Sequence, residues 1–316
     1  LIIQKKFLSV RDMRHLLLDS CSFKNLEMLK HIIIDCKLIS DYHEDTWDKG
    51  LWCAAKNGHA DVVSFLLHSR SGKMLTQNNG PRCFHDVFYD DDDEDVSENL
   101  ALHIACENGH FDVVKLLLDY LSENPGATHI NLKNDDDGYT PLMIACEKKE
   151  TEIVKLLLEQ DDLEVNLQDN EGKSAFYHAC LNLSLECVKL LSQHPSIEIK
   201  SSGERLPFHG FALEWDIGID PLSGWTKMFE FLCSLPNIDI NDRDAEGRTV
   251  LHCACVTETD NPQLVKKILQ QPNIDINAED ENGDTALRLA VKRQNFEIIQ
   301  EIVSYGVEKG IKPNVV

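Results

Sequence analysis

Apolar side chains in this chain recur in short runs that are separated by polar turns. Residues 101–118 read ALHIACENGHFDVVKLLL and residues 141–158 read PLMIACEKKETEIVKLLL, so one order of large, small and polar side chains returns 40 positions later. Within each stretch the apolar residues lie at the spacing that is typical of helices with one buried face. The pattern therefore predicts pairs of short helices joined by tight turns.

Two parts of this template have a clear physical role. We expect Ala105 and Cys106 to lie where a neighbouring helix approaches closely, and Gly109 to form the turn, because a positive φ angle is least costly for glycine. The second helix, residues 113–118, should pack its valine and leucine side chains against adjacent units. One pair cannot bury this face alone, so only a stack of pairs is stable.

The template recurs along almost the whole chain with a basal period of about 33 residues. About eight copies are predicted, which begin near Leu16, Gly50, Ala101, Pro141, Ala175, Pro207, Val250 and Ala286. Several copies carry a segment close to Thr-Pro-Leu-His-x-Ala. The matching segments are Thr140-Pro141-Leu142 with Ala145, Thr249-Val250-Leu251-His252 with Ala254, and Leu102-His103-Ile104-Ala105.

On these segments the chain resembles the ankyrin-repeat family, and the resemblance covers about nine tenths of its length. It implies an all-α solenoid of helix-turn-helix units joined by β-hairpin-like loops. We expect residues 1–316 to form one such array. The first unit has Leu18 and Lys24 where histidine and glycine are usual, which suits a divergent capping unit.

Two insertions interrupt the array. The first, at 69–96, ends in the acidic run 90–95, which is either a self-repelling loop or a docking segment for a basic partner. The second, at 213–224, is expected between the two helices of the sixth unit, on the side opposite the hairpins.

The charge balance and the cysteine positions indicate which ligands and which location to expect. The 31 Lys and Arg residues against 54 Asp and Glu residues give a formal charge of −23, which repels a phosphate backbone, so we expect no nucleic-acid ligand. No apolar stretch of about 18 residues occurs, so we expect no direct membrane insertion. Five cysteines share one template position, which favours small buried side chains with free thiols and a cytoplasmic location. They are Cys21, Cys106, Cys146, Cys180 and Cys255.

Candidate chemistry is sparse. His252, Cys253 and Cys255 resemble a metal cluster, but no second cysteine pair with zinc spacing accompanies them, so we expect no metal and no cofactor. At His103, His209 and His252 the family resemblance implies hydrogen bonds between neighbouring hairpin loops rather than catalysis. Because no nucleophile with a catalytic signature accompanies these histidines, we predict that the protein is not an enzyme.

The resemblance also implies that hairpin tips and first helices form a concave surface that binds protein partners. The predicted partner-binding residues are Glu107, Asn108, Asp136, Asp137, Tyr139, Glu147, Lys148, Asn170, Glu171, Lys173, Leu181, Ala245, Glu246 and Arg248. Further exposed positions are expected at Asn182, Val256, Thr257, Glu281, Asn282, Asp284, Lys292 and Arg293.

We therefore expect a monomeric scaffold or adaptor that binds a basic or mixed-charge segment of a partner protein. The alternative is the regulatory ankyrin region of a larger protein, such as a channel, a signalling enzyme or a secreted microbial effector. The start at Leu1 rather than Met favours this alternative slightly. The resemblance further implies that asparaginyl hydroxylases modify the hairpin asparagines, although asparagine in a turn commonly hydrogen-bonds its own hairpin. These are Asn131, Asn166, Asn241 and Asn277.

Overall fold

The computed structural model describes residues 10–35, 44–69, 101–124, 130–199, 209–210, 212, 222–236, 238–257 and 261–314. The chain divides into two compact units, Leu1–Asn170 and Glu171–Val316. The acidic run 90–95, with most of the first predicted insertion, lies outside the described residues.

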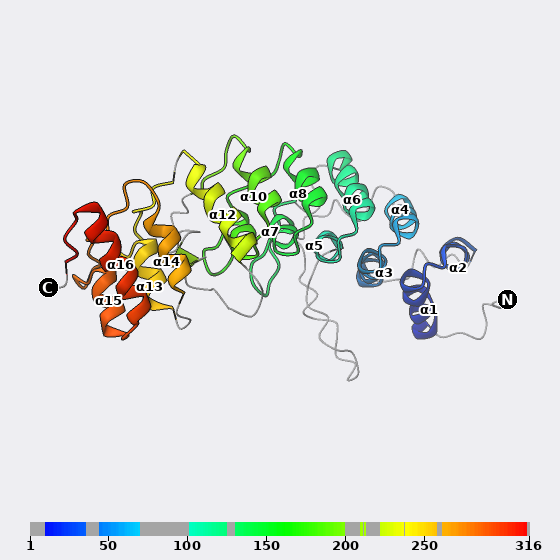
Figure 1. The fold of residues 1–316 in the computed structure, drawn as a ribbon. Coiled ribbons are helices and arrows are strands. Elements are labelled where there is room, and N and C mark those ends of the chain that lie inside the picture. Colours follow the sequence, from blue (N-terminus) through cyan, green and yellow to red (C-terminus); the bar gives the residue numbers. More distant parts are fainter. Residues whose placement is uncertain are drawn as a thin grey trace. The chain divides into compact units, whose positions relative to one another are not determined.

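In the first unit, two rows of helices lie side by side. The first row contains α1 (Val10–Ser22), α3 (Glu44–Lys56), α5 (Ala101–Glu107) and α7 (Pro141–Glu147). The second row contains α2 (Leu26–Lys30) with the π-helical turn η1 (His31–Asp35), α4 (Ala60–Ser69), α6 (Phe111–Glu123) and α8 (Thr151–Leu158). Consecutive first-row helices contact one another, and so do α4, α6 and α8 (Figure 1).

The second unit repeats this arrangement. Its described helices are α9 (Ala175–Leu181), α10 (Leu185–Ser192), α12 (Leu222–Ser234), α13 (Val250–Val256), α14 (Pro262–Leu269), α15 (Ala286–Lys292) and α16 (Phe296–Lys309). Helix α13 contacts α15, and α14 contacts α16 (Figure 1). The predicted all-α architecture of helix pairs is confirmed. In the described part of the chain, no helix combines the length and the apolarity that crossing a bilayer needs.

Local sequence decides where the first helices begin. Thr140 Oγ1 accepts a hydrogen bond from Met143 N at 3.3 Å, which satisfies one of the free N–H groups of the first turn of α7. Pro141 takes the first helical position, where its missing N–H costs nothing. The same type of cap recurs at Ser174 before α9 and at Thr285 before α15.

Several turns between paired helices contain a residue with a positive φ angle. The angle is +70° at both Gly58 and Gly109, as expected for Gly109. Non-glycine residues take this conformation in other turns, at Lys24 (φ 56°), Lys149 (φ 65°) and Leu183 (φ 54°). The left-handed conformation costs a side chain roughly 1–2 kcal/mol, so the packing on either side of these turns stabilises them.

The core lies between the helix rows, and the shared cysteine position is at its centre. Cys106, Cys146 and Cys180 are 0% exposed, and Cys255 is 2% exposed. Burial raises the pKa of the Cys21 thiol to about 12. The interpretation of these cysteines as small buried side chains is confirmed.

The sixth unit differs from the prediction. Helix α12 begins at Leu222, so residues 222–224 are helical and do not belong to the predicted insertion at 213–224. Trp225 and Phe229 stack with ring centroids 4.8 Å apart and are 3% and 0% exposed. Residues 213–221 lie outside the described residues.

Candidate interaction surface

The hairpin loop before α7 is closed by Asn134. Its backbone N–H donates to Tyr139 O at 2.9 Å, and its side-chain Oδ1 accepts from Tyr139 N at 2.6 Å. Asn170, from the following loop, holds the exposed tip: its backbone N–H donates to Asp137 O at 3.0 Å, and its Nδ2 donates to Asp136 O at 3.2 Å. The backbone of the tip is therefore fixed before any partner arrives.

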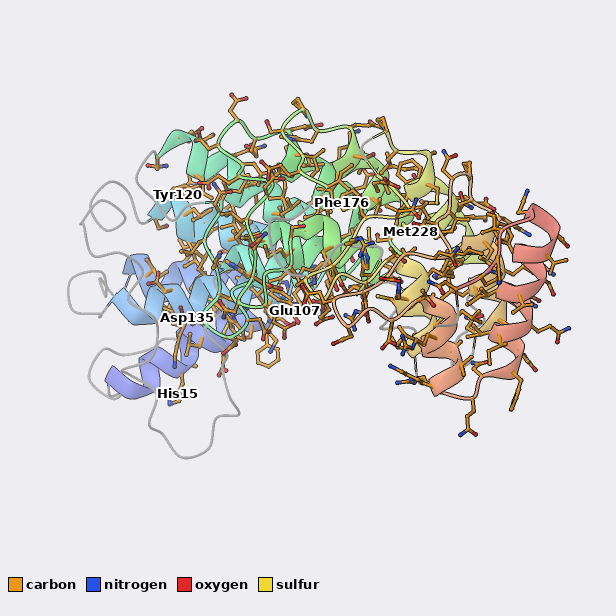
Figure 2. All side chains as sticks on the ribbon, turned by 90° about the vertical axis from the view of Figure 1, so that its left-hand side faces the viewer. His15, Glu107, Tyr120, Asp135, Phe176 and Met228 are labelled. Atoms are coloured by element: carbon orange, nitrogen blue, oxygen red, sulfur yellow. The ribbon has the colours of Figure 1, made fainter. Side chains whose placement is uncertain are left out.

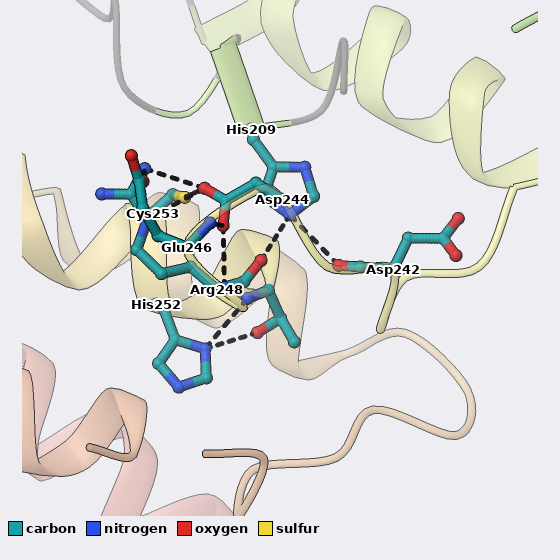
Figure 3. Close-up of polar contacts among 8 residues, drawn as sticks. His209, Asp242, Asp244, Glu246, Arg248, His252 and Cys253 are labelled. Carbon is teal, nitrogen blue, oxygen red and sulfur yellow. Dashed lines mark hydrogen bonds and ion pairs between the residues drawn. The ribbon is translucent and has the colours of Figure 1, made fainter. Parts of the chain in front are cut away.

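In the loop before α13, an aspartate closes the turn in the same way (Figure 3). Asp244 Oδ1 accepts from Glu246 N at 3.0 Å and from Arg248 N at 2.8 Å, while Oδ2 accepts from Arg248 Nε at 2.9 Å. The side chain of Asp244 is 2% exposed, whereas that of Glu246 is 62% exposed. The Asp244 carboxylate therefore builds the loop, and the Glu246 carboxylate lies exposed at its tip, where it pairs with Arg248.

The family-position histidines connect consecutive units. His103 Nε2 donates to Leu132 O at 2.9 Å and to Tyr139 O at 3.1 Å, both in the next hairpin loop. His209 Nε2 donates to Arg248 O at 2.8 Å. Because both partners of His103 Nε2 are carbonyl oxygens, this nitrogen must carry the proton. The predicted structural role of these histidines is confirmed.

Burial keeps these imidazoles neutral. It lowers the pKa of His103 to about 4, although its two backbone hydrogen bonds act in the opposite direction. The pKa of His209 and that of His252 are lowered for the same leading reason.

Both ring nitrogens of His252 form hydrogen bonds within the protein, so neither is free to bind a metal together with Cys253 and Cys255. Nδ1 accepts from Thr249 N at 3.1 Å (Figure 3), and Nε2 donates to Asp284 O at 3.1 Å. The thiol of Cys253 lies 3.9 Å from Asp244 Oδ2, on the hairpin side of the helix. No group of three or more potential ligands that could hold a metal occurs among the residues that the structure describes.

Asn131 and Asn277 bind the following loop rather than their own. Asn131 Nδ2 donates to Asp162 O at 2.7 Å, and its Oδ1 accepts from Glu164 N at 2.8 Å. Asn277 makes the same pair of bonds to Lys312 O and to the backbone N–H of Asn314. The expectation that each asparagine closes its own hairpin is therefore wrong at these positions. The amide serves as a link between consecutive loops, a role that the sequence pattern of one hairpin cannot reveal.

The predicted partner-binding residues of the first unit are all at least partly accessible. They are Glu107, Asn108, Asp136, Asp137, Tyr139, Glu147, Lys148 and Asn170. Asp135, which is not among the predicted residues, is exposed at the same tip. Figure 2 shows Glu107 and Asp135 on one side of the unit and Tyr120 of α6 on the other. The hairpin tip and the end of α5 thus lie on a common side, away from the second-row helix.

Charge on this side is unevenly compensated. Lys148 Nζ lies 3.7 Å from Glu107 Oε1 and 3.2 Å from Glu147 Oε1, so one cation is shared by two carboxylates. Asp136 and Asp137 form no ion pair with any described residue. The hairpin tip therefore carries two negative charges that no described cation pairs with.

In the second unit the corresponding positions carry both signs of charge. The predicted residues there, all at least partly accessible, are Glu171, Lys173, Leu181, Ala245, Glu246 and Arg248. Lys173 Nζ lies 3.0 Å from Glu171 Oε2, and Arg248 forms ion pairs with Asp244 and Glu246. These positions therefore offer a mixed and largely self-paired surface.

Two positions that were expected to be exposed are buried. Asp284 is 6% exposed because Arg288 Nε contacts it at 3.1 Å and Lys292 also bonds to it. Thr257 is 8% exposed, and its carbonyl accepts a hydrogen bond from Arg293 Nη1 at 2.9 Å. Both errors arise because long basic side chains of α15 and its following turn cover the neighbouring backbone, which a repeat template does not show.

Comparison with known proteins supports the repeat architecture. A family model described as ankyrin repeats in three copies matches residues 17–129, 120–202 and 222–314. Among solved structures, the human ASB11 ankyrin repeat domain is 21% identical, with 81% of this chain and 96% of that chain covered and a TM-score of 0.54. An ankyrin repeat domain from Acinetobacter baumannii AYE is 22% identical, with 65% and 97% covered and a TM-score of 0.51.

Proposed function

Because this chain belongs to the ankyrin-repeat family, whose members generally serve as protein-interaction modules, we propose that it is a scaffold or adaptor that binds a partner protein. The contact surface is formed by the hairpin tips and the ends of the first-row helices. Its partner is a protein segment that is basic or of mixed charge. In this role the chain needs no catalytic group, and its histidines and cysteines serve the fold.

The observation that carries the proposal is the tip at Asp136 and Asp137. Asn170 fixes the backbone of both residues from the neighbouring loop, so little ordering entropy is lost when a partner binds. Their carboxylates are exposed and unpaired within the described residues, unlike Glu107 and Glu147, which share Lys148. A rigid tip with free negative charge suits the capture of lysine or arginine side chains.

The proposal that the chain is not an enzyme rests on how its reactive groups are used. The ankyrin fold is typically non-catalytic. The imidazole of His103 is held neutral, with Nε2 donating to backbone carbonyls, and the Cys106 thiol is fully buried with a raised pKa. Neither group can reach a substrate without local unfolding.

The proposal is tested on a partner that full-length protein recovers by pull-down. We expect the double variant Asp136→Lys, Asp137→Lys to associate at least about tenfold more slowly, because a like-charged tip repels a basic segment. The matched control is Asp119→Lys, Glu123→Lys, which makes the same charge change on the exposed face of α6.

The salt dependence of the association rate shows whether the charges of the hairpin tip attract the partner over a distance. The Debye length is about 8 Å at physiological ionic strength, so the wild-type rate should fall as salt rises from about 0.05 to 0.5 M. The tip variant should show a weaker dependence than the control variant. Equal rates for the two variants, with no response to salt, would show that the tip is not the docking site.

A further inference from the structure

Three asparagines in the described part of the chain are followed directly by glycine. The pairs are Asn57-Gly58, Asn108-Gly109 and Asn282-Gly283. A further pair, at positions 79–80, lies outside the described residues. In such a pair the backbone nitrogen of glycine can attack the side-chain carbonyl carbon of asparagine, because no Cβ of the second residue hinders the approach. The pair is therefore reactive wherever the asparagine side chain and the glycine nitrogen can meet.

The three pairs share the same local backbone. All three asparagines are exposed, and the glycines have φ angles of +70°, +70° and +74°. Each glycine N–H donates to the carbonyl oxygen three residues earlier, at 3.2 Å for Gly58, 3.3 Å for Gly109 and 3.0 Å for Gly283. A difference in reactivity must therefore come from the asparagine side chain and from what surrounds the glycine.

In the first unit both asparagine side chains are held by the helix that precedes them. Asn57 Nδ2 donates to Cys53 O at 2.8 Å, and Asn108 Nδ2 donates to Ile104 O at 2.8 Å. Each acceptor lies about one helical turn earlier, so each amide points back along its helix and away from the following glycine. Attack by the glycine nitrogen requires this hydrogen bond to break first.

The two glycines of the first unit are also covered. A side-chain carbon at Gly58 would lie 2.7 Å from Nδ1 of His110, and one at Gly109 would lie 2.7 Å from Oε1 of Glu150. His110 and Glu150 each belong to the next repeat, which therefore packs directly against the turn. This packing restrains the rotation that would bring the glycine nitrogen to the asparagine side chain.

Neither restraint applies at Asn282-Gly283, on the hairpin tip before α15. Asn282 donates its backbone N–H to Asp280 Oδ1 at 2.8 Å, but its side-chain amide forms no hydrogen bond with any described residue. Apart from the chain neighbours of Gly283, no described residue comes within 4 Å of a side-chain carbon placed there. Only the hydrogen bond from Gly283 N to Asp280 O must open before the two groups can meet.

We propose that Asn282 is a deamidation site, at which the side-chain amide is converted to a carboxylate without an enzyme. The nitrogen of Gly283 loses its proton to water and bonds to Cγ of Asn282. The bond from Cγ to the amide nitrogen breaks, and this nitrogen takes up a proton and leaves as ammonia. Water then opens the cyclic imide at either carbonyl carbon, which yields aspartate or isoaspartate.

The reaction changes the charge of the hairpin tip. Both products carry one negative charge that asparagine lacks, directly beside the exposed Glu281. The tip then has two adjacent acidic residues before its glycine, as the tip at Asp136 and Asp137 has before Gly138. The negative charge of the second unit therefore increases with the age of the protein.

The test is incubation of the full chain in mildly alkaline buffer, followed by mass mapping of peptides that are cut at low pH. The peptide with Asn282 should gain the mass difference between an amide and an acid at least about tenfold faster than the peptides with Asn57 and Asn108. The reason is that these two sites must first lose a hydrogen bond and the cover of the next repeat. The modified peptide should elute as two species of equal mass, because the imide opens in two ways.

The matched control is the same incubation in urea, which removes the fold and keeps the sequence. The three rates should then become similar, since each site is an asparagine followed by glycine. Three similar rates in the folded protein would overturn the proposal. So would an Asn282 that stays unmodified in the folded chain although it reacts in urea, or a single product, which would exclude the imide.

Discussion

His103 Nε2 lies 2.9 Å from the carbonyl oxygen of Leu132, so a side chain of one repeat holds the hairpin loop of the next repeat. The imidazole can donate this bond while its other nitrogen stays unprotonated inside the core. Burial lowers the pKa of His103 to about 4. The link between two units therefore depends on pH.

We expect the free energy of unfolding to fall as the pH drops from about 6.5 to about 4. The ordinary histidine pKa near 6.5 applies to the unfolded chain, so the unfolded state binds the extra proton below about pH 6.5 and the folded state only near pH 4. The contribution of neutral His103 is complete above pH 6.5 and is lost between the two values, a change of about 3 kcal/mol. Urea unfolding from pH 7.5 to 4.5 measures it.

His103→Gln is the informative variant for this prediction. Glutamine keeps an N–H donor but does not titrate, so the variant should be less stable than wild type at neutral pH and lose less stability on acidification. Parallel pH profiles for the two proteins would contradict a neutral, buried imidazole at this position.

Leu117→Ala should destabilise the first unit locally. Leu117 is 6% exposed in α6, and a leucine-to-alanine change in a core costs about 2–5 kcal/mol through the cavity that it leaves. Because each unit of an array contacts only its neighbours, hydrogen exchange should accelerate in α4, α6 and α8 and much less in α16. Exchange that rises equally in α16 would argue against such an array, and Lys115→Ala on the exposed face of α6 is the control.

All thiols should be reduced in the native protein. Cys106, Cys146 and Cys180 are fully buried in helix seams, and burial raises the pKa of Cys21 to about 12, so thiolate is scarce. A thiol reagent should modify these residues only after urea is added. Two or more intrachain disulfides, found by mass spectrometry of fresh protein without reductant, would contradict this expectation.

Hydroxylation of the hairpin asparagines is a prediction that rests on family resemblance. Asn241 Nδ2 donates to Asn273 O at 2.8 Å, and its Oδ1 accepts from Asp275 N at 2.8 Å, so the side chain is released only when consecutive loops separate. We expect an asparaginyl hydroxylase to add one oxygen at Asn131, Asn166, Asn241 or Asn277, faster under mildly destabilising conditions. Peptide masses that stay unchanged at all four positions would contradict this prediction.

Most of the fold could be predicted from rules that involve only residues close in sequence. Gly109 was identifiable because a tight turn between two helices needs a positive φ angle, and its φ angle in the structure is +70°. Cys106 and Cys146 were identifiable as core residues because they recur at one position of a helical template. Such features depend on residues close in sequence, so a single chain is enough to reveal them.

The candidate surface was predicted less well, because the exposure of a residue depends on which side chains from other parts of the fold cover it. The sequence placed Asp284 on the surface, but Arg288 and Lys292 cover it. Asn170 was predicted to contact a partner, and the structure also shows it holding the loop that contains Asp136 and Asp137.

The sequence by itself determined the helix pairs, their turns and the apolar side of each helix, since periodicity records which residues share a face. Only the tertiary structure decided which faces are covered. Leu269 and Val303 occupy equivalent helix positions, yet one is 3% and the other 40% exposed. The difference lies in the presence of a following helix pair, which removes one apolar side chain from water and leaves the other in contact with it.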